Sequence, residues 1–191
     1  MTGPSPEAVV IGASAGALEA LSLILPTLPA DFGLPLFIVV HVPPDRESLL
    51  AELFGAKCRI KVREAEDKEP VHGGTVYFAP ADYHLLVEPD KSLSLSNEEP
   101  VLYSRPSLDV LFESAADAYG PGLIGIVLTG ANQDGARGLK AIAEAGGAAI
   151  VQNPLGAYAA AMPEAAIAEV PGAKVLSLHE IADYLQGVGK A

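Results

Sequence analysis

Residues 12–16 read Gly-Ala-Ser-Ala-Gly, a G-x-S-x-G pattern centred on Ser14. An apolar run at 8–11 precedes the pattern, and a longer apolar segment starts at Ala17. Strand, tight turn and helix in this order are typical of a nucleophile elbow, in which the flanking glycines allow a sharp turn and leave the serine hydroxyl exposed. A serine hydroxyl is a weak nucleophile by itself, so the pattern requires a histidine base and an orienting acid elsewhere.

Two further residues lie where such partners are needed. His41 directly follows an apolar run at 36–40, and Asp134 lies in a glycine-bearing loop after the run at 123–128. Reactive groups in open α/β sheets gather at the carboxyl ends of strands. The sequence therefore predicts a triad of Ser14, His41 and Asp134. Its order along the chain differs from the Ser–Asp–His order of α/β-hydrolases, but triads are recognised by geometry rather than by order.

The elements that would position these residues alternate along the chain. Apolar runs predicted to be strands lie at 8–11, 36–40, 123–128 and 148–151. Helix-like segments lie at 17–25, 46–54 (with Asp45 as its cap), 107–119, 136–145 and 163–170, and the capping box 177–180 begins a last helix. Strands that are apolar throughout are buried on both faces. The pattern predicts an α/β fold, a three-layer αβα arrangement with a mostly parallel, doubly wound sheet of Rossmann-like topology.

The middle of the chain has a different pattern. Between residues 57 and 97 the apolar runs are short and alternate with polar residues, and turn signals such as Gly73-Gly74 separate them. We expect antiparallel strands or hairpins that form one edge of the sheet. No internal repeat or linker is evident, so we expect a single catalytic domain over 1–191 with a core of about 8–185.

The same residues have simpler interpretations. A glycine-rich turn before a helix can hold a phosphate at the helix N-terminus, although Ser14 and Ala17 replace the second and third glycines of the dinucleotide pattern. Asp134 can cap the helix that follows it, alone or in addition to a catalytic role. His84 is the main rival of His41, with hydrogen bonding to a loop as its alternative role.

Composition narrows the class of protein. The 191 residues contain 24 acidic and 12 basic side chains, a net charge of −12, which argues against a nucleic-acid partner. Cys58 is the only cysteine, so neither an intrachain disulfide nor a multi-cysteine metal site is expected. The first residues do not resemble a signal peptide, and the apolar stretch 8–28 is too interrupted for a membrane span. These features predict a soluble, cytoplasmic protein that is not membrane-embedded.

Six segments in this order resemble the catalytic domain of the chemotaxis receptor methylesterase family (CheB, protein-glutamate methylesterase), from about Val9 to Leu185. They are IGASAG (11–16), HVPP (41–44), GGTVYFAP (73–80) followed by YH (83–84), RPSLDVLF (105–112), LTG to DGA (128–136) and AMPEAA (161–166). The resemblance places the nucleophile, base and acid on Ser14, His41 and Asp134, and so favours His41 over His84.

The resemblance also implies an activity. It implies a serine esterase that hydrolyses glutamate γ-methyl esters on the signalling helices of chemoreceptors or on a similar methylated protein, and that also deamidates receptor glutamines. Backbone N–H groups around Ala15, Gly16 and Ala131 would bind the oxyanion and substrate. No cofactor or metal is expected. We also expect a separate receiver or methyltransferase partner, because no segment of the sequence resembles the receiver domain usual in the family.

The chain departs from the family pattern at several positions. Ala15 replaces the usual threonine after the nucleophile, Ala17 replaces a glycine, and Ala131 and Asn132 replace methionine and glycine in the acid loop. These changes weakly favour a non-catalytic signalling module of the same fold, and an esterase for another substrate is a second alternative. Basic residues beside the cleft would dock an acidic receptor helix, with Arg137 and Lys140 as first candidates and Arg46 as the next.

Overall fold

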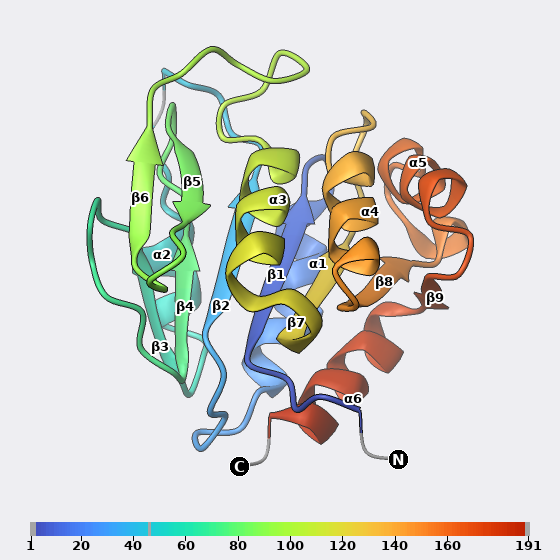
Figure 1. Ribbon diagram of the computed structural model, residues 1–191, viewed down its shortest axis with the longest axis horizontal. Helices are drawn as coiled ribbons and strands as arrows, with labels where there is room; N and C mark the ends of the chain where they lie inside the picture. Colours follow the sequence, from blue (N-terminus) through green and yellow to red (C-terminus); the bar gives the residue numbers. More distant parts are fainter. Residues whose placement is uncertain (1–2, 46, 190–191) are drawn as a thin grey trace.

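A seven-stranded sheet forms the middle layer of the molecule (Figure 1), in the computed structural model that describes residues 3–45 and 47–189. Every strand pair in this sheet is parallel. In sheet order the strands are β3 (Lys61–Glu64), β4 (Thr75–Phe78), β2 (Leu36–Val40), β1 (Ala8–Ala13), β7 (Leu123–Val127), β8 (Ala148–Gln152) and β9 (Lys174–Leu176). The predicted parallel α/β sheet is confirmed.

Helices cover both faces of the sheet, with α3 and α4 in front and α1 and α2 behind in the view of Figure 1. Side chains of β1 divide between two apolar cores, with Val9 and Ile11 in one and Ala8 and Val10 in the other. This division explains why the strand is apolar throughout. The helices are α1 (Ala17–Ile24), α2 (Leu50–Gly55), α3 (Leu108–Tyr119), α4 (Ala136–Glu144), α5 (Ala161–Glu169) and α6 (Leu178–Val188), with 3₁₀ turns at Leu25–Thr27, Gly120–Gly122 and Pro154–Gly156.

The helix ends test the sequence predictions. The capping box before α6 is confirmed, because Ser177 Oγ accepts from Glu180 N at 3.2 Å and the Glu180 carboxylate accepts from Ser177 N at 2.7 Å. The predicted start of the second helix is wrong, since α2 begins at Leu50 and Asp45 does not cap it. Residues 47–49 bury no apolar side chain, and Leu49 is 65% exposed, so nothing drives helix formation there.

The fifth helix also begins earlier than predicted, at Ala161 rather than at Pro163. Proline is tolerated anywhere in the first turn of a helix, because the N–H groups of that turn have no partner within the helix. Pro163 therefore marks the start of the helix only to within one turn.

The middle segment corrects one prediction in part. The antiparallel pair exists, formed by β5 (His84–Val87) and β6 (Leu93–Ser96), but it is a separate two-stranded sheet that packs against α3. The earlier runs are parallel strands β3 and β4 of the main sheet. The alternation around Val62 has another origin, because β3 is an edge strand whose side chains are only partly covered.

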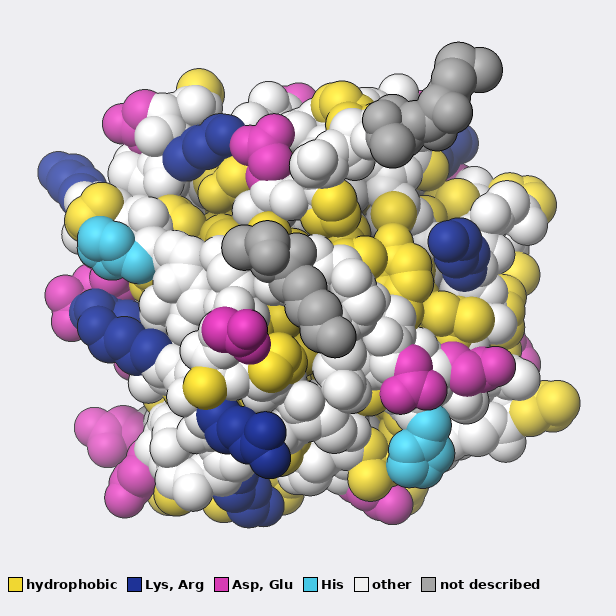
Figure 2. Space-filling view, turned by 90° about the horizontal axis from the view of Figure 1, so that it is seen from below, with side chains coloured by type: hydrophobic (Ala, Val, Ile, Leu, Met, Phe, Trp, Pro, Cys, Tyr) yellow, Lys and Arg dark blue, Asp and Glu magenta, His cyan; other side chains and the backbone are white. Residues whose placement is uncertain are grey.

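The connections reverse direction beside β1. The chain proceeds through α1 to β2 on one side of β1, and later returns through α3 to β7 on the other side. In such sheets a crevice opens at the carboxyl ends of the strands where the order reverses. Figure 2 shows the opposite end of the sheet, where acidic and basic side chains are interspersed. None of the helices in the described part of the chain is long and apolar enough to cross a membrane.

Candidate active site

Strand register brings Ser14 and His41 together. Ala13 of β1 is paired with Val40 of β2, so the next residue of each strand emerges at the same edge of the sheet. His41 N donates to Ala13 O at 3.1 Å, and Ser14 N donates to the carbonyl of Thr129, after β7, at 2.9 Å. The candidate nucleophile therefore lies between the ends of two neighbouring strands, one of which carries the candidate base.

The two glycines of the serine motif have different functions. Gly16 has a φ of 85°, and a Cβ there would lie 2.5 Å from Cβ of Tyr158, so both the turn and its packing require glycine. Gly12 lies within β1, where a Cβ would lie 2.0 Å from Cδ2 of Leu108. The expectation that both glycines shape the turn is thus correct for Gly16, whereas Gly12 allows the start of α3 to approach the sheet.

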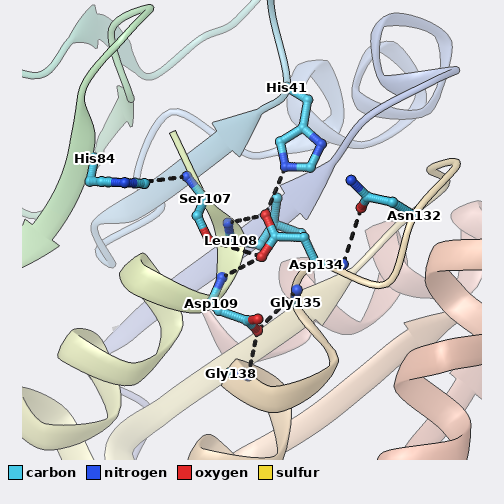
Figure 3. A network of polar contacts seen from close by, with 9 residues as sticks. All are labelled: His41, His84, Ser107, Leu108, Asp109, Asn132, Asp134, Gly135 and Gly138. Carbon is cyan, nitrogen blue, oxygen red and sulfur yellow. Dashed lines mark hydrogen bonds and ion pairs between the residues drawn. The ribbon is translucent and has the colours of Figure 1, made fainter. Parts of the chain in front are cut away.

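His41 and Asp134 form a direct pair (Figure 3). The distance from His41 Nε2 to Asp134 Oδ2 is 2.7 Å. The Asp134 side chain is fully buried, whereas the His41 side chain is 12% exposed and faces the crevice. An ionised carboxylate only accepts hydrogen bonds. Nε2 is therefore the protonated nitrogen in neutral His41, and Nδ1 remains as the basic atom.

Three donors from the start of α3 complete the surroundings of Asp134. Oδ1 accepts from Ser107 Oγ at 2.9 Å and from Asp109 N at 3.0 Å, while Oδ2 accepts from Leu108 N at 2.7 Å. Burial on its own would raise the pKa of this carboxyl. The hydrogen bond from His41 and those from the N–H groups of Asp109 and Leu108 outweigh burial and hold the pKa of Asp134 below its ordinary value.

Asp134 does not cap the helix that follows it, which was its alternative interpretation. Asp134 precedes α4, but the N-cap residue of α4 is Gly135, which has no side chain to form a capping hydrogen bond. The carboxylate instead accepts two backbone N–H groups at the start of α3. Ionised Asp134 therefore lies at the positive end of the α3 dipole, which favours its charge.

The other histidines take no part in the pair. His84 is buried and joins two loops, since its Nε2 lies 3.0 Å from Glu99 O and its Nδ1 accepts from Ser107 N at 3.2 Å. His72 and His179 are exposed. His84 therefore has the loop-bonding role that was its alternative interpretation, and it supports Ser107 beside Asp134 (Figure 3).

The Ser14 hydroxyl makes no hydrogen bond to His41 within residues 3–45 and 47–189. Ser14 is half-buried and emerges beside His41, whose Nδ1 is the ring nitrogen left to receive its proton. Catalytic hydrogen bonds are often long in structures without substrate and shorten in the reactive complex. A hydrogen bond between Ser14 and His41 in the reactive complex therefore stays a prediction.

Three backbone N–H groups near Ser14 are available for an oxyanion. Within the described ranges, the N–H groups of Ala15, Gly16 and Ala131 donate to no protein acceptor. Ala15 and Gly16 are half-buried, and Ala131 is exposed. The two loops that carry them are joined, because Thr129 Oγ1 donates to Ala15 O at 2.8 Å. These groups are the predicted oxyanion donors, and their assignment remains a prediction.

Aromatic side chains line two cavities near the candidate site. A cavity of about 110 Å³ beside His41 is lined by Val42, Arg105 and Tyr103, and Tyr103 is fully exposed at 103%. A second cavity of about 270 Å³ beside Gly16 is lined by Tyr158, which is 79% exposed. Exposed tyrosine rings thus lie beside both His41 and Gly16.

The basic residues proposed for docking have acidic neighbours. Arg137 pairs with Glu113 and Lys140 with Glu169, each at 3.4 Å. Both pairs are exposed, so they constrain these basic side chains only weakly. Arg46 lies outside the described residues.

Sequence reasoning missed the residues that hold Asp134. The N–H groups of Leu108 and Asp109 and the hydroxyl of Ser107 all donate to the Asp134 carboxylate. The sequence predicted only a helix over these residues. The sequence offers no signal for these contacts, because the burial of Ser107 and Asp109 at the start of α3 is a property of the folded chain. Among the described residues, no group of three potential metal ligands comes together.

The fold and the paired residues define a class of protein. A serine on a strand–helix turn, next to a histidine paired with a buried aspartate at the switch point of an α/β sheet, is typical of a serine hydrolase site. The family model for CheB methylesterase matches residues 9–185. The chain belongs to the CheB methylesterase family.

Individual proteins agree with the family. A Leptospira interrogans protein is 51% identical over 177 residues, which cover 93% of this chain and 92% of that protein. A protein-glutamate methylesterase/protein-glutamine glutaminase of Archaeoglobus fulgidus is 39% identical over 93% of this chain, although the match covers 52% of that longer protein. The crystal structure of the Thermotoga maritima CheB methylesterase catalytic domain superimposes with a TM-score of 0.90 at 33% identity, and covers 96% of this chain and 99% of that one.

Proposed function

We propose that this protein is a serine methylesterase of bacterial-type chemotaxis signalling, which removes methyl groups from glutamate γ-methyl esters of chemoreceptors. Its family and the names of its relatives support the reaction. The observation that carries the site assignment is the 2.7 Å contact between His41 and Asp134, with Ser14 on the neighbouring strand end.

In this proposal Ser14 is the nucleophile. Its Oγ attacks the ester carbonyl while Nδ1 of His41 accepts the hydroxyl proton. Asp134 holds the ring through Nε2 and stabilises the imidazolium that forms. The oxyanion of the tetrahedral intermediate binds to N–H groups of Ala15, Gly16 and Ala131, and each such donor typically contributes about 3–4 kcal/mol in the transition state.

The proton on His41 then leaves with methoxide as methanol, and the glutamyl group stays on Ser14 as an ester. Water attacks this ester while His41 accepts a proton from it, and the proton returns to Ser14 Oγ as the carboxylate is released. The same acyl chemistry converts a glutamine side chain to glutamate with ammonia as the leaving group. Receptor glutamines are therefore proposed as a second substrate.

Two measurements test the proposal. A fluorophosphonate probe should label the wild type, and labelling should be lost in Ser14→Ala but kept when the exposed Ser5 is replaced by alanine. Methanol release from a methylated chemoreceptor should depend on Ser14 in the same way. A labelled enzyme that releases no methanol from receptor would point to another ester substrate, and equal labelling of Ser14→Ala would overturn the serine assignment.

A further inference from the structure

An aspartate at the start of α3 caps α4, and an aspartate at the start of α4 caps α3. Asp134, just before α4, accepts the N–H groups of Leu108 and Asp109 at the start of α3. Asp109, in the first turn of α3, accepts the N–H groups of Gly135 at 3.0 Å and Gly138 at 2.7 Å at the start of α4. Figure 3 shows this reciprocal arrangement.

The exchange attaches Asp109 to Asp134 at two places. Its backbone N–H holds the Asp134 carboxylate, and its side-chain Oδ1 holds the backbone N–H of the very next residue, Gly135. Both carboxyl groups are almost completely buried, at 3% and 0% exposure. These contacts couple the position of Asp134 to that of Asp109, because Asp109 binds both the side chain of Asp134 and the backbone of the residue that follows it.

Packing allows little adjustment between the two helices. A Cβ on Gly138 would lie 2.5 Å from Cβ of Phe112 and 3.1 Å from Cα of Asp109. Gly135 has a φ of 99°, a conformation that glycine adopts readily, and its N–H donates to Asp109 Oδ1. The close approach at Gly138 and the turn at Gly135 thus place both donors on one acceptor atom.

We propose that Asp109 is a positioning residue of the active site, which sets the place and orientation of Asp134 and, through Asp134, the imidazole of His41. The proposal rests on the proposed esterase function for its kinetic consequences, but not for its structural ones. Asp109 does not line the crevice beside Ser14. It faces a separate cavity of about 390 Å³ between the turn at Leu102, α4 and α5. Its loss should therefore change the rate of the chemical step rather than substrate binding.

The part of Asp109 that matters is an acceptor oxygen at the position of Oδ1. Asn keeps that acceptor, whereas Ala removes it and leaves the N–H groups of Gly135 and Gly138 without a partner. Asp109 Oδ2 has no hydrogen-bond partner from the described residues, so the amide nitrogen of Asn displaces no existing bond. Comparison of the Ala and Asn variants thus shows whether the acceptor oxygen, rather than the charge of the side chain, is what the site requires.

The kinetic test compares Asp109→Ala with Asp109→Asn, with Asp117→Ala on the exposed side of α3 as matched control. Misplacing a catalytic group by about 1 Å can cost about 100-fold in rate, so Asp109→Ala should lower kcat about 10- to 100-fold with KM within about twofold. Asn should keep kcat within about threefold, since it retains the acceptor. Asp117→Ala should equal the wild type. A folded Asp109→Ala protein with near-normal kcat would overturn the proposal, as would an Asn variant as slow as Ala.

A spectroscopic readout tests the proposal without any substrate. The His41 Nε2 proton, hydrogen-bonded to Asp134, should give a downfield imidazole resonance in ¹H NMR. This resonance should persist in Asp109→Asn and shift or broaden in Asp109→Ala at temperatures well below unfolding. A purely stabilising residue would lower the melting temperature and leave the resonance of the folded protein in place, which would refute the positioning role. If Asp109→Ala does not fold, Asp109→Glu replaces it, because one extra methylene moves the acceptor while the charge is kept.

Discussion

Replacing Asp134 by Asn should damage both catalysis and stability, for reasons that follow from its four donors. His41 Nε2 and Leu108 N donate to one oxygen, and Ser107 Oγ and Asp109 N donate to the other. An amide offers only one acceptor oxygen. If that oxygen keeps Ser107 and Asp109, the amide NH₂ faces the other two donors.

The consequence for catalysis lies in the tautomer of His41. An NH₂ group opposite Nε2 favours the ring with Nε2 unprotonated, which places the proton on Nδ1, where the base is needed. A wrong tautomer in a serine triad costs on the order of 10⁴-fold in kcat. We expect Asp134→Asn to lose about 10³–10⁴-fold in kcat, measured by methanol release from methylated receptor.

The consequence for stability lies at the start of α3. The N–H of Leu108 becomes a buried donor without an acceptor, which costs about 1–3 kcal/mol, and the charge-assisted bonds of the carboxylate are weakened as well. We expect the free energy of unfolding in urea to fall by about 2–4 kcal/mol, whereas exposed Asp117→Asn should change neither quantity. An Asp134→Asn protein within tenfold of wild-type kcat would refute the assignment of Asp134 as the orienting acid.

Three further predictions concern single positions. Burial, followed by the charge of Asp134 and then that of Glu113, raises the pKa of Asp109 to about 6, against the opposing N–H bonds of Gly138 and Gly135. The folded state then binds the proton of Asp109 more tightly than the unfolded state does, so the contribution of Asp109 to the free energy of unfolding falls by about 1 kcal/mol as pH rises from about 5 to about 8. Arg137 and Glu169 also line the cavity that Asp109 faces. Asp109→Asn should remove this pH-dependent loss, as measured by urea unfolding at the two pH values. Gly12→Ala should lower stability by about 1–3 kcal/mol and also lower kcat, since its Cβ would displace Leu108 and the start of α3; circular dichroism melting and initial rates would show an unaffected variant if this packing argument is wrong. Ala15→Thr should raise kcat modestly, since one added neutral hydrogen bond contributes about 0.5–1.5 kcal/mol, and an unchanged or lower rate would mean that the site is built around alanine.

The sequence by itself determined the parts that depend on local pattern. Apolar runs such as 36–40 predicted buried parallel strands, because a strand covered on both faces needs apolar residues at every position. The G-x-S-x-G motif and the residues that follow two other strands predicted the positions of Ser14, His41 and Asp134, because strand ends meet at one edge of a parallel sheet. These inferences needed only chain periodicity and the geometry common to such sheets.

Only the tertiary structure decided which groups surround the candidate acid. Ser107, Leu108 and Asp109 are more than 20 residues away from Asp134 in the sequence, with separations of 27, 26 and 25. Local pattern assigns each cap to its own helix, whereas here α3 and α4 exchange theirs, because Gly138 lets the two helices approach closely and Gly12 lets the start of α3 approach the sheet. The same limit applies to β3, whose alternation indicated a hairpin although its true cause is an edge position in the main sheet. Partners that arise from packing between distant segments leave no periodic trace in the sequence, so they become visible only once the chain has folded.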